Sequence, residues 1–334
     1  MSDCSERCDT TLRDGIVQAE RGISSPEGLK WTLYRKMLQI RRVEESLLQL
    51  FTRGILFGTV HTCIGQEPCG VGVTQALEPA TDVVWSNHRG HGHYLAFTGD
   101  LQGLISEILG KASGACGGIG GSQHLHNRNI YTNGILGGTL PCAAGCAFAE
   151  KFKKTGGIVT VFFGDGAFGE GVVYETFNVA SLWGLPILFV LEDNGYAQST
   201  PKALEHAGEI SRRAESFNIP ITRLEADHAV SVWQTASGIV REIRRNQRPQ
   251  LLALQTYRLA PHSKGDDNRD PQELEAHWAA DPLKRHRQEL AAEDAPRLEQ
   301  LEQEVGEEIQ RCIDFAINDK PMETAHFLKY VDQG

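Results

Sequence analysis

Residues 156–200, GGIVTVFFGDGAFGEGVVYETFNVASLWGLPILFVLEDNGYAQST, decide the fold of this chain. Residues 158–163 form a continuous β-branched and aromatic run, as in a strand buried on both faces. Residues 170–183 carry apolar side chains at helical spacing and end before Gly184, and residues 187–191 form a second apolar run. The stretch therefore predicts a strand–helix–strand unit of an α/β fold, with a mostly parallel central sheet and helices on both faces. In such sheets, ligands bind at the carboxyl ends of the strands.

The glycine turn after the first strand, residues 164–169, satisfies the G-x-G-x-x-G pattern of dinucleotide-binding proteins. However, Asp165 follows its first glycine, and a carboxylate there would repel a pyrophosphate unless a cation lay between them. Asn194, 29 positions later, ends the next apolar strand. Together with a backbone carbonyl such as that of Tyr196, these oxygens form a half-shell that suits Mg²⁺ or Ca²⁺. The helix that opens at Glu170 would add its positive end to a bound diphosphate.

The same turn also carries a resemblance to a known family. Gly164-Asp165-Gly166, followed by an asparagine that closes an apolar strand, is the thiamine diphosphate (ThDP) motif. The surrounding residues resemble the alpha subunit of the decarboxylating component of 2-oxoacid dehydrogenase complexes, which act on pyruvate, branched-chain 2-oxo acids or acetoin. The resemblance extends from about Tyr34 to about Leu290. It implies a ThDP-binding fold, in which the cofactor contacts Gly164, Asp165, Gly166, Ala167, Asn194 and Tyr196, and the metal ligands are Asp165, Asn194 and Tyr196.

A long amphipathic helix is predicted over residues 29–52, where apolar side chains recur every three and four positions. Its charged face is predicted to be solvated. The helix also matches the family signature YR…M…RR.E. The charged and signature residues are Tyr34, Arg35, Lys36, Met37, Arg41, Arg42, Glu44 and Glu45.

The next segment, residues 58–67, resembles the G..H...GQE motif of the family. A lone histidine is more often a packed or surface residue than a catalyst, but its place in this motif implies that His61 forms a wall of the substrate channel. Gln66 and Glu67 are expected to begin a structural helix.

Residues 87–93, NHRGHGH, place three histidines close together, at positions 88, 91 and 93, which could form a metal site on a strand. The glycines and Arg89 fit the [YH]-R-x-H-G segment of the family better. The resemblance then implies that His88 and Arg89 reach the cofactor, with the fixed fork of guanidinium donors on the diphosphate. His91 and His93 are expected only to shape the turn.

Two glycine-rich segments complete the expected cofactor site. Residues 116–124 resemble G.GGS.H, a loop that faces the cofactor and the partner subunit. The family commonly has Met where this chain has Gln123, and this departure leaves the choice of substrate open. In residues 133–138, the resemblance implies that the backbone of Gly134 hydrogen-bonds the aminopyrimidine, with Leu136 beneath the ring. Leu136 could equally be a core residue.

Residues 257–269, which follow a predicted buried strand at 249–256, are polar and predict a mobile loop. They resemble the YR..HS...D loop of the family, which orders over bound ThDP. By that resemblance, His262 lies near the thiazolium and assists acyl transfer to a lipoyl group, for which its ordinary pKa range is suited. Ser263 matches a regulatory phosphorylation site of some relatives.

Length and composition limit the class of protein. The 334 residues carry a formal net charge of −10, and the pattern of charges and apolar runs leads us to expect no basic stripe for nucleic acid, no signal peptide and no membrane span. Eight scattered cysteines without a C-x-x-C pair predict reduced thiols in a cytoplasmic protein. The expected organisation is an N-terminal arm over residues 1–28, a domain for the diphosphate half of ThDP over 29–270, and a helical extension over 271–334.

The function follows from the resemblance. In this family the glutamate that activates the aminopyrimidine belongs to a beta subunit, so the chain is expected to be inactive alone and to form an alpha2-beta2 heterotetramer. The implied reaction decarboxylates a pyruvate-like 2-oxo acid and passes the acyl group to a lipoyl-bearing acyltransferase. Within the family, acetoin cleavage or transfer of a two-carbon unit from a ketose to a carrier protein stays open. Outside it, an NAD-dependent oxidoreductase and a non-catalytic scaffold are the alternatives.

Overall fold

The computed structural model of the chain describes residues 26–263, 265, 267–325 and 328. Residues 1–25, which form most of the expected N-terminal arm, lie outside this part of the chain. Within it, none of the helices combines the length and the apolar character that a membrane span requires.

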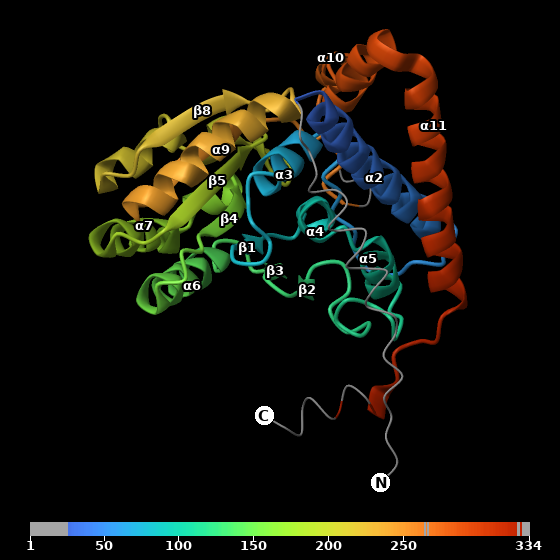
Figure 1. Cartoon of the computed structure of the whole chain (residues 1–334), viewed down its shortest axis with the longest axis horizontal. Helices are drawn as coiled ribbons and strands as arrows, with labels where there is room; N and C mark the ends of the chain where they lie inside the picture. The colour runs from blue at the N-terminus through green and yellow to red at the C-terminus, as the bar shows by residue number, and fades with distance from the viewer. Residues whose placement is uncertain (1–25, 264, 266, 326–327, 329–334) are drawn as a thin grey trace.

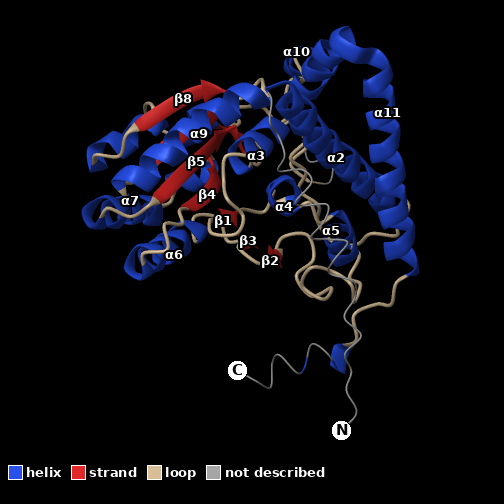
Figure 2. Cartoon of the chain, viewed as in Figure 1, coloured by secondary structure: helices blue, strands red, loops and turns tan. Residues whose placement is uncertain are grey.

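One seven-stranded sheet forms the centre of the molecule, in the order β2-β3-β1-β4-β5-β9-β8 (Figure 2). All of its strand pairs are parallel except β2 with β3, so the expected mostly parallel α/β sheet is confirmed. Its strands are β1 (Val83–Ser86), β2 (His126–Asn127), β3 (Ile130–Thr132), β4 (Val159–Gly164), β5 (Ile187–Asp193), β8 (Ile221–Glu225) and β9 (Gln250–Gln255). A separate two-stranded ribbon consists of β6 (Tyr196–Ala197) and β7 (Thr200–Pro201).

Helices cover both faces of the sheet, as expected (Figure 1). Alternate residues of the central strands enter two different cores: Phe162 and Val190 pack with α2, α3 and α9, whereas Phe163 and Leu191 pack with α6 and α7. Both faces are therefore apolar, which explains why these strands show no polar alternation. The helices are α2 (Pro26–Thr52), α3 (Glu67–Thr74), α4 (His91–Thr98), α5 (Leu101–Ile108), α6 (Thr139–Lys153), α7 (Gly171–Trp183), α8 (Lys202–Glu205), α9 (Ala229–Asn246), α10 (Pro271–Ala279) and α11 (Pro282–Asn318), with 3₁₀ turns at Gly166–Gly169 and Ile210–Phe217.

The strand–helix–strand unit predicted within residues 156–200 is confirmed as β4, α7 and β5. α7 ends at Gly184, which adopts the left-handed conformation (φ 59°) that glycine tolerates without strain. β4 and β5 are paired so that Gly164 lies opposite Glu192. The residues that follow the two strands therefore leave the sheet side by side.

The long helix α11 runs along the edge of the molecule beside α2 (Figure 1). It is interrupted at Asp294, whose backbone is not helical, two residues before Pro296. Its buried side chains, Leu298, Val305 and Ile309, join the same apolar core as those of α2 and α5.

The predicted solvation of the charged face of α2 is wrong for Arg41 and Glu44, which are both buried. Arg41 is 5% exposed, and its Nε donates to Glu67 Oε1 of α3 at 2.5 Å. Its two terminal nitrogens donate to the two carboxylate oxygens of Asp281 at 2.8 and 2.9 Å, and Asp281 in turn caps the first turn of α11. Arg41 of α2 thus connects α2 with α3 and α11. A buried guanidinium group requires paired carboxylates, and Asp281 forms a bidentate ion pair with it.

Replacing Arg41 with Met should destabilise the protein by about 3–5 kcal/mol, since it leaves two carboxylates buried without their cation. Denaturant unfolding would measure the loss. Arg35→Met is a matched control on the same helix, because the partners of Arg35, Glu304 and Glu308, are partly exposed, and its cost should stay below about 1 kcal/mol. Equal losses in the two variants would contradict a structural role for the buried ion pairs.

Candidate active site

A cavity of about 300 Å³ opens at the carboxyl ends of β4 and β5. It brings together segments that lie far apart in the sequence. Every residue expected from the sequence to be catalytic or to bind the cofactor or metal lines it: His61, His88, Arg89, Gly134, Leu136, Gly164, Asp165, Gly166, Ala167, Asn194, Tyr196 and His262.

Asp165 presents an unsatisfied carboxylate to this cavity. It is 2% exposed; its Oδ1 accepts a hydrogen bond from Gly166 N at 2.9 Å, while its buried Oδ2 has no partner among the described residues. Burial, and secondly the negative charge of Asp193, raises the pKa of Asp165 to about 6. His206 Nε2 lies 2.9 Å from the carbonyl oxygen of Asp165 and holds the turn in place. A buried oxygen of this kind requires a cation or a proton.

Asn194 follows the neighbouring strand and lies in the same cavity. Its Oδ1 accepts a hydrogen bond from the backbone N–H of Tyr196 at 3.0 Å, and its Nδ2 donates to Gln66 Oε1 at 3.3 Å. The amide oxygen therefore keeps a lone pair beside the turn of Asp165. Carboxylate, amide and backbone carbonyl oxygens are the donors that Mg²⁺ and Ca²⁺ prefer, so these residues fit the expected metal.

The effect of the unsatisfied Asp165 carboxylate on stability can be tested in the protein without any ligand. The pKa of Asp165 is raised above its unfolded value, so this carboxyl destabilises the ligand-free protein progressively as pH rises from about 4 to about 6, and fully above that. We expect Asp165→Asn to raise the stability of the ligand-free protein at pH 7 by about 1–2 kcal/mol, with little gain near pH 4.

Thermal unfolding at several pH values would measure this gain. Asp227→Asn is the control, because Asp227 is an exposed partner of Arg285 and its replacement should give no gain. A loss of stability at pH 7 in Asp165→Asn would show that the carboxylate is satisfied within the ligand-free protein.

Arg89 supplies buried positive charge in the same cavity. It is 5% exposed, and burial together with the nearby Arg258 lowers its pKa to about 9. Its bonds to described residues, namely Thr62 O at 2.8 Å, His262 O at 3.2 Å and His262 Nδ1 at 2.7 Å, use three of its five N–H groups. Two guanidinium groups buried close together favour an anion such as a diphosphate.

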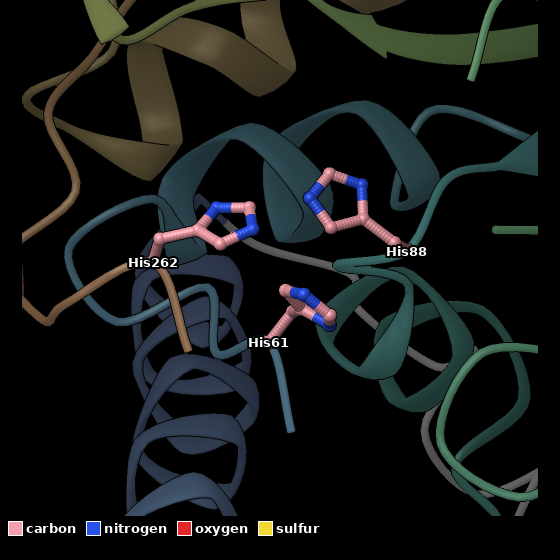
Figure 3. A group of neighbouring side chains, drawn as sticks. All are labelled: His61, His88 and His262. Carbon is pink, nitrogen blue, oxygen red and sulfur yellow. The ribbon is translucent and has the colours of Figure 1, made fainter. Parts of the chain in front are cut away.

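Three histidines form a cluster within the cavity. Figure 3 shows the rings of His88 and His262 directed toward each other, with His61 beside both. The ring of His61 lies 4.8 Å from that of His88 and 4.7 Å from that of His262, between centroids. Burial, and then the positive charge of Arg89, lowers the pKa of His88 to about 2, so His88 is neutral at any physiological pH.

Gln123 is the polar neighbour of this cluster, and Glu107 fixes the loop that carries it. Gln123 Nε2 lies 3.1 Å from His61 Nδ1. The buried carboxylate of Glu107 accepts four backbone N–H bonds of 2.7–3.1 Å from the glycine-rich loop, from Cys116, Gly118, Gly120 and Gly121. Glu107 was not predicted from the sequence, in which an acidic residue ahead of a glycine-rich stretch was the available signal.

The remaining histidines of the NHRGHGH segment do not line the cavity. His91 and His93 lie in the first turn of α4 and are buried. His93 Nδ1 lies 2.7 Å from Ser86 Oγ and its Nε2 lies 3.2 Å from Glu192 Oε1, so this ring braces a residue that does line the cavity. His93 therefore supports a residue of the cavity in addition to its expected role in shaping the turn. Gln66, expected to be structural, also lines the cavity.

The loop after β9 reaches the cavity through His262, and its ends are anchored. The N–H of Leu259 donates to Ile64 O at 2.9 Å, and Arg269 Nη2 donates to the carbonyl oxygen of Ala260 at 2.9 Å. Tyr257 and Tyr196 both donate hydrogen bonds to Glu273 of α10, at 2.8–2.9 Å. The loop and the turn after β5 are thereby tied to the same carboxylate.

These features define a class: α/β proteins with a charged cavity at the carboxyl ends of parallel strands. Comparison with known proteins is more specific. The profile of the dehydrogenase E1 component family matches residues 35–326. The chain is 37% identical over 306 residues to the alpha subunit of acetoin:2,6-dichlorophenolindophenol oxidoreductase of Bacillus subtilis, covering 88% of this chain and 91% of that protein.

Two further relatives are pyruvate dehydrogenase E1 component alpha subunits. The Zymomonas mobilis protein is 37% identical over 293 residues, 85% of this chain and 82% of its own length. The testis-specific mitochondrial form of Rattus norvegicus is 32% identical over 325 residues, 94% of this chain and 81% of its own length. The chain belongs to the dehydrogenase E1 component family, as an alpha subunit of its ThDP-dependent enzymes.

Proposed function

We propose that this chain holds the diphosphate of ThDP, with Mg²⁺ or Ca²⁺, in the cavity at the ends of β4 and β5. The observation that carries the proposal is the buried carboxylate oxygen of Asp165, which lacks a partner among the described residues and lies in one cavity with Asn194 and Arg89. Asp165, Asn194 and the backbone carbonyl of Tyr196 would hold the metal, and Arg89 would bind the diphosphate with its remaining donors.

When bound, ThDP supplies an electron sink for decarboxylation of a 2-oxo acid. The chain positions the cofactor and the substrate around it. The backbone of Gly134 would bind the aminopyrimidine, and Leu136, which is partly exposed at the cavity, would lie beneath it. His61 would form a wall of the substrate channel, and His262 would move a proton during transfer of the acyl group.

The proposed substrate is a pyruvate-like 2-oxo acid, and the proposed acceptor is a lipoyl group on an acyltransferase. The relative from Bacillus subtilis makes acetoin a second candidate substrate. A ketose donor with a carrier-protein acceptor is the third, because Gln123 departs from the residue common in the family.

A beta subunit is the proposed partner, and an exposed apolar cluster supports such an interface. Phe148 and Phe152 of α6 lie near Trp183, which follows Leu182 at the end of α7. The ring of Phe148 lies 6.3 Å from that of Phe152 and 5.5 Å from that of Trp183. Phe152 and Leu182 are 78% and 73% exposed, and clustered apolar exposure of this kind marks association surfaces. We propose an alpha2-beta2 heterotetramer.

Calorimetric titration of ThDP into the chain produced together with its beta partner tests the cofactor site. We expect binding with Mg²⁺ present and its loss with a chelator, because the carboxylate of Asp165 repels a diphosphate unless a cation lies between them. Asp165→Ala should abolish metal-dependent binding, whereas Asp227→Ala, at an exposed aspartate, should not change it. Retained affinity in Asp165→Ala would contradict the metal assignment, and binding of NAD instead of ThDP would favour the dinucleotide alternative.

The partner surface has its own test. Phe152→Glu with Leu182→Glu should prevent co-purification with the beta subunit, because two charges would be buried in an apolar interface. The folding of the chain itself should be unaffected, since both side chains are exposed. Ile317→Glu, at an exposed position on α11 far from α6, is the control (Figure 1). Normal assembly of the double variant would place the interface elsewhere.

A further inference from the structure

The three-histidine cluster has two possible chemistries. The ligand-capable atoms of His61, His88 and His262 all lie within 4.8 Å of one another, a separation that would suit a transition metal. They could instead present N–H groups to oxygen atoms of a substrate. The positions of the protons on His61 and His262 decide between these, because a nitrogen that carries a proton cannot ligate a metal.

The proton of His262 is placed by its arginine neighbours. Nδ1 of His262 lies 2.7 Å from Arg89 Nη2 and 3.4 Å from Arg258 Nη1. A guanidinium group has donors only, so Nδ1 must accept. The neutral ring therefore carries its hydrogen on Nε2, on the edge directed toward His88 (Figure 3).

The proton of His61 is placed by Gln123. The amide Nε2 of Gln123 lies 3.1 Å from His61 Nδ1 and donates to it, so the hydrogen of His61 also lies on Nε2. Gln123 itself is held by its backbone, whose carbonyl accepts a hydrogen bond from Thr132 Oγ1 at 2.7 Å. Its side-chain oxygen packs against Gly134, where a Cβ atom would approach Oε1 to 2.3 Å.

We propose that Gln123 and Arg89 fix His61 and His262 as Nε2–H donors, so that the cluster binds uncharged substrate oxygen atoms and not a metal ion. Gln123 is then a positioning residue that acts through His61. The nearby charges also disfavour a metal ion at the cluster, because Arg89 and Arg258 repel a cation. The substrate oxygen is the carbonyl of a 2-oxo acid or the hydroxyl of a hydroxyketone. The role in turnover rests on the proposed function.

A double-mutant cycle tests the link between Gln123 and His61. Gln123→Met should lower kcat/KM at least about tenfold, whereas the same change in a His61→Ala background should cost less than about threefold. Turnover would be measured on the complex with its beta subunit, once with pyruvate and once with acetoin. The substrate for which Gln123→Met lowers kcat/KM more is the one whose oxygen atom the cluster binds. Gln303→Met, at an exposed glutamine of α11, is the control.

Each result of the cycle decides the proposal. An unchanged kcat/KM in Gln123→Met, or an equal loss in both backgrounds, overturns it. ThDP affinity of Gln123→Met, measured by calorimetry, should stay within about threefold of the native value. If ThDP binding is lost in Gln123→Met but kept in the native complex, Gln123 holds the cofactor and the proposal is overturned. If the native complex itself does not bind ThDP, the proposed function is contradicted.

Two further measurements cover the case in which His61→Ala has no measurable turnover. Gln123→Glu gives His61 a carboxylate partner, so the pH profile of kcat/KM should move by about one unit or more, and an unmoved profile overturns the proposal. Titration of Zn²⁺ into the ThDP-free complex should show no site that depends on the cluster. Stoichiometric Zn²⁺ binding that His88→Ala abolishes would show that the cluster is a metal site.

Discussion

The cavity of this protein depends on the burial of two opposite charges, at Asp165 and Arg89, that form no ion pair among the described residues. Asp165 places a carboxylate oxygen without a described partner in a cavity, and Arg89 places a guanidinium with remaining donors in the same cavity. Each of these side chains would be costly in an ordinary core. Together they give the cavity a negative and a positive group before any ligand binds. The folded, ligand-free protein therefore bears the electrostatic cost of both buried charges. A cofactor that brings a metal ion and a diphosphate would remove this cost, because it supplies a counter-charge to each group.

The parallel sheet makes this polarisation possible. Because β4 and β5 are adjacent and parallel, the turns after them emerge at the same edge, with the first acid after β4 beside the polar residues that end β5. The surrounding helices then supply the supports: α4 carries the histidine that braces Glu192, α5 carries the carboxylate that holds the glycine-rich loop, and α10 holds the loop of His262. The cavity is thus lined by loops but fixed by regular elements.

The sequence predicted the sheet and most of the cavity, because both depend on local patterns. Asp165 and Asn194 each follow an apolar run that is typical of a buried strand. Because the two strands are adjacent and parallel, both residues lie at the same edge of the sheet. Ion pairs and hydrogen bonds between residues far apart in the chain produce no local pattern in the sequence. Arg41 looked like a solvated position of an amphipathic helix, and its burial is explained by two partners on other helices, Glu67 of α3 and Asp281, which lies 240 residues later. Gln66 and Glu107 were likewise missed, because their roles depend on contacts with loops rather than on helical spacing.

The pairing of α2 with α11 has a consequence for how the chain folds during synthesis. Tyr34 Oη donates to Glu302 at 2.6 Å, across a separation of 268 residues. The first described helix therefore leaves the ribosome long before the helix that covers it has been made. During that interval its apolar face remains accessible to chaperones or to neighbouring nascent chains. Completion of the core is expected to be a late, post-translational event, and the yield of native protein to depend on how well this early helix is protected.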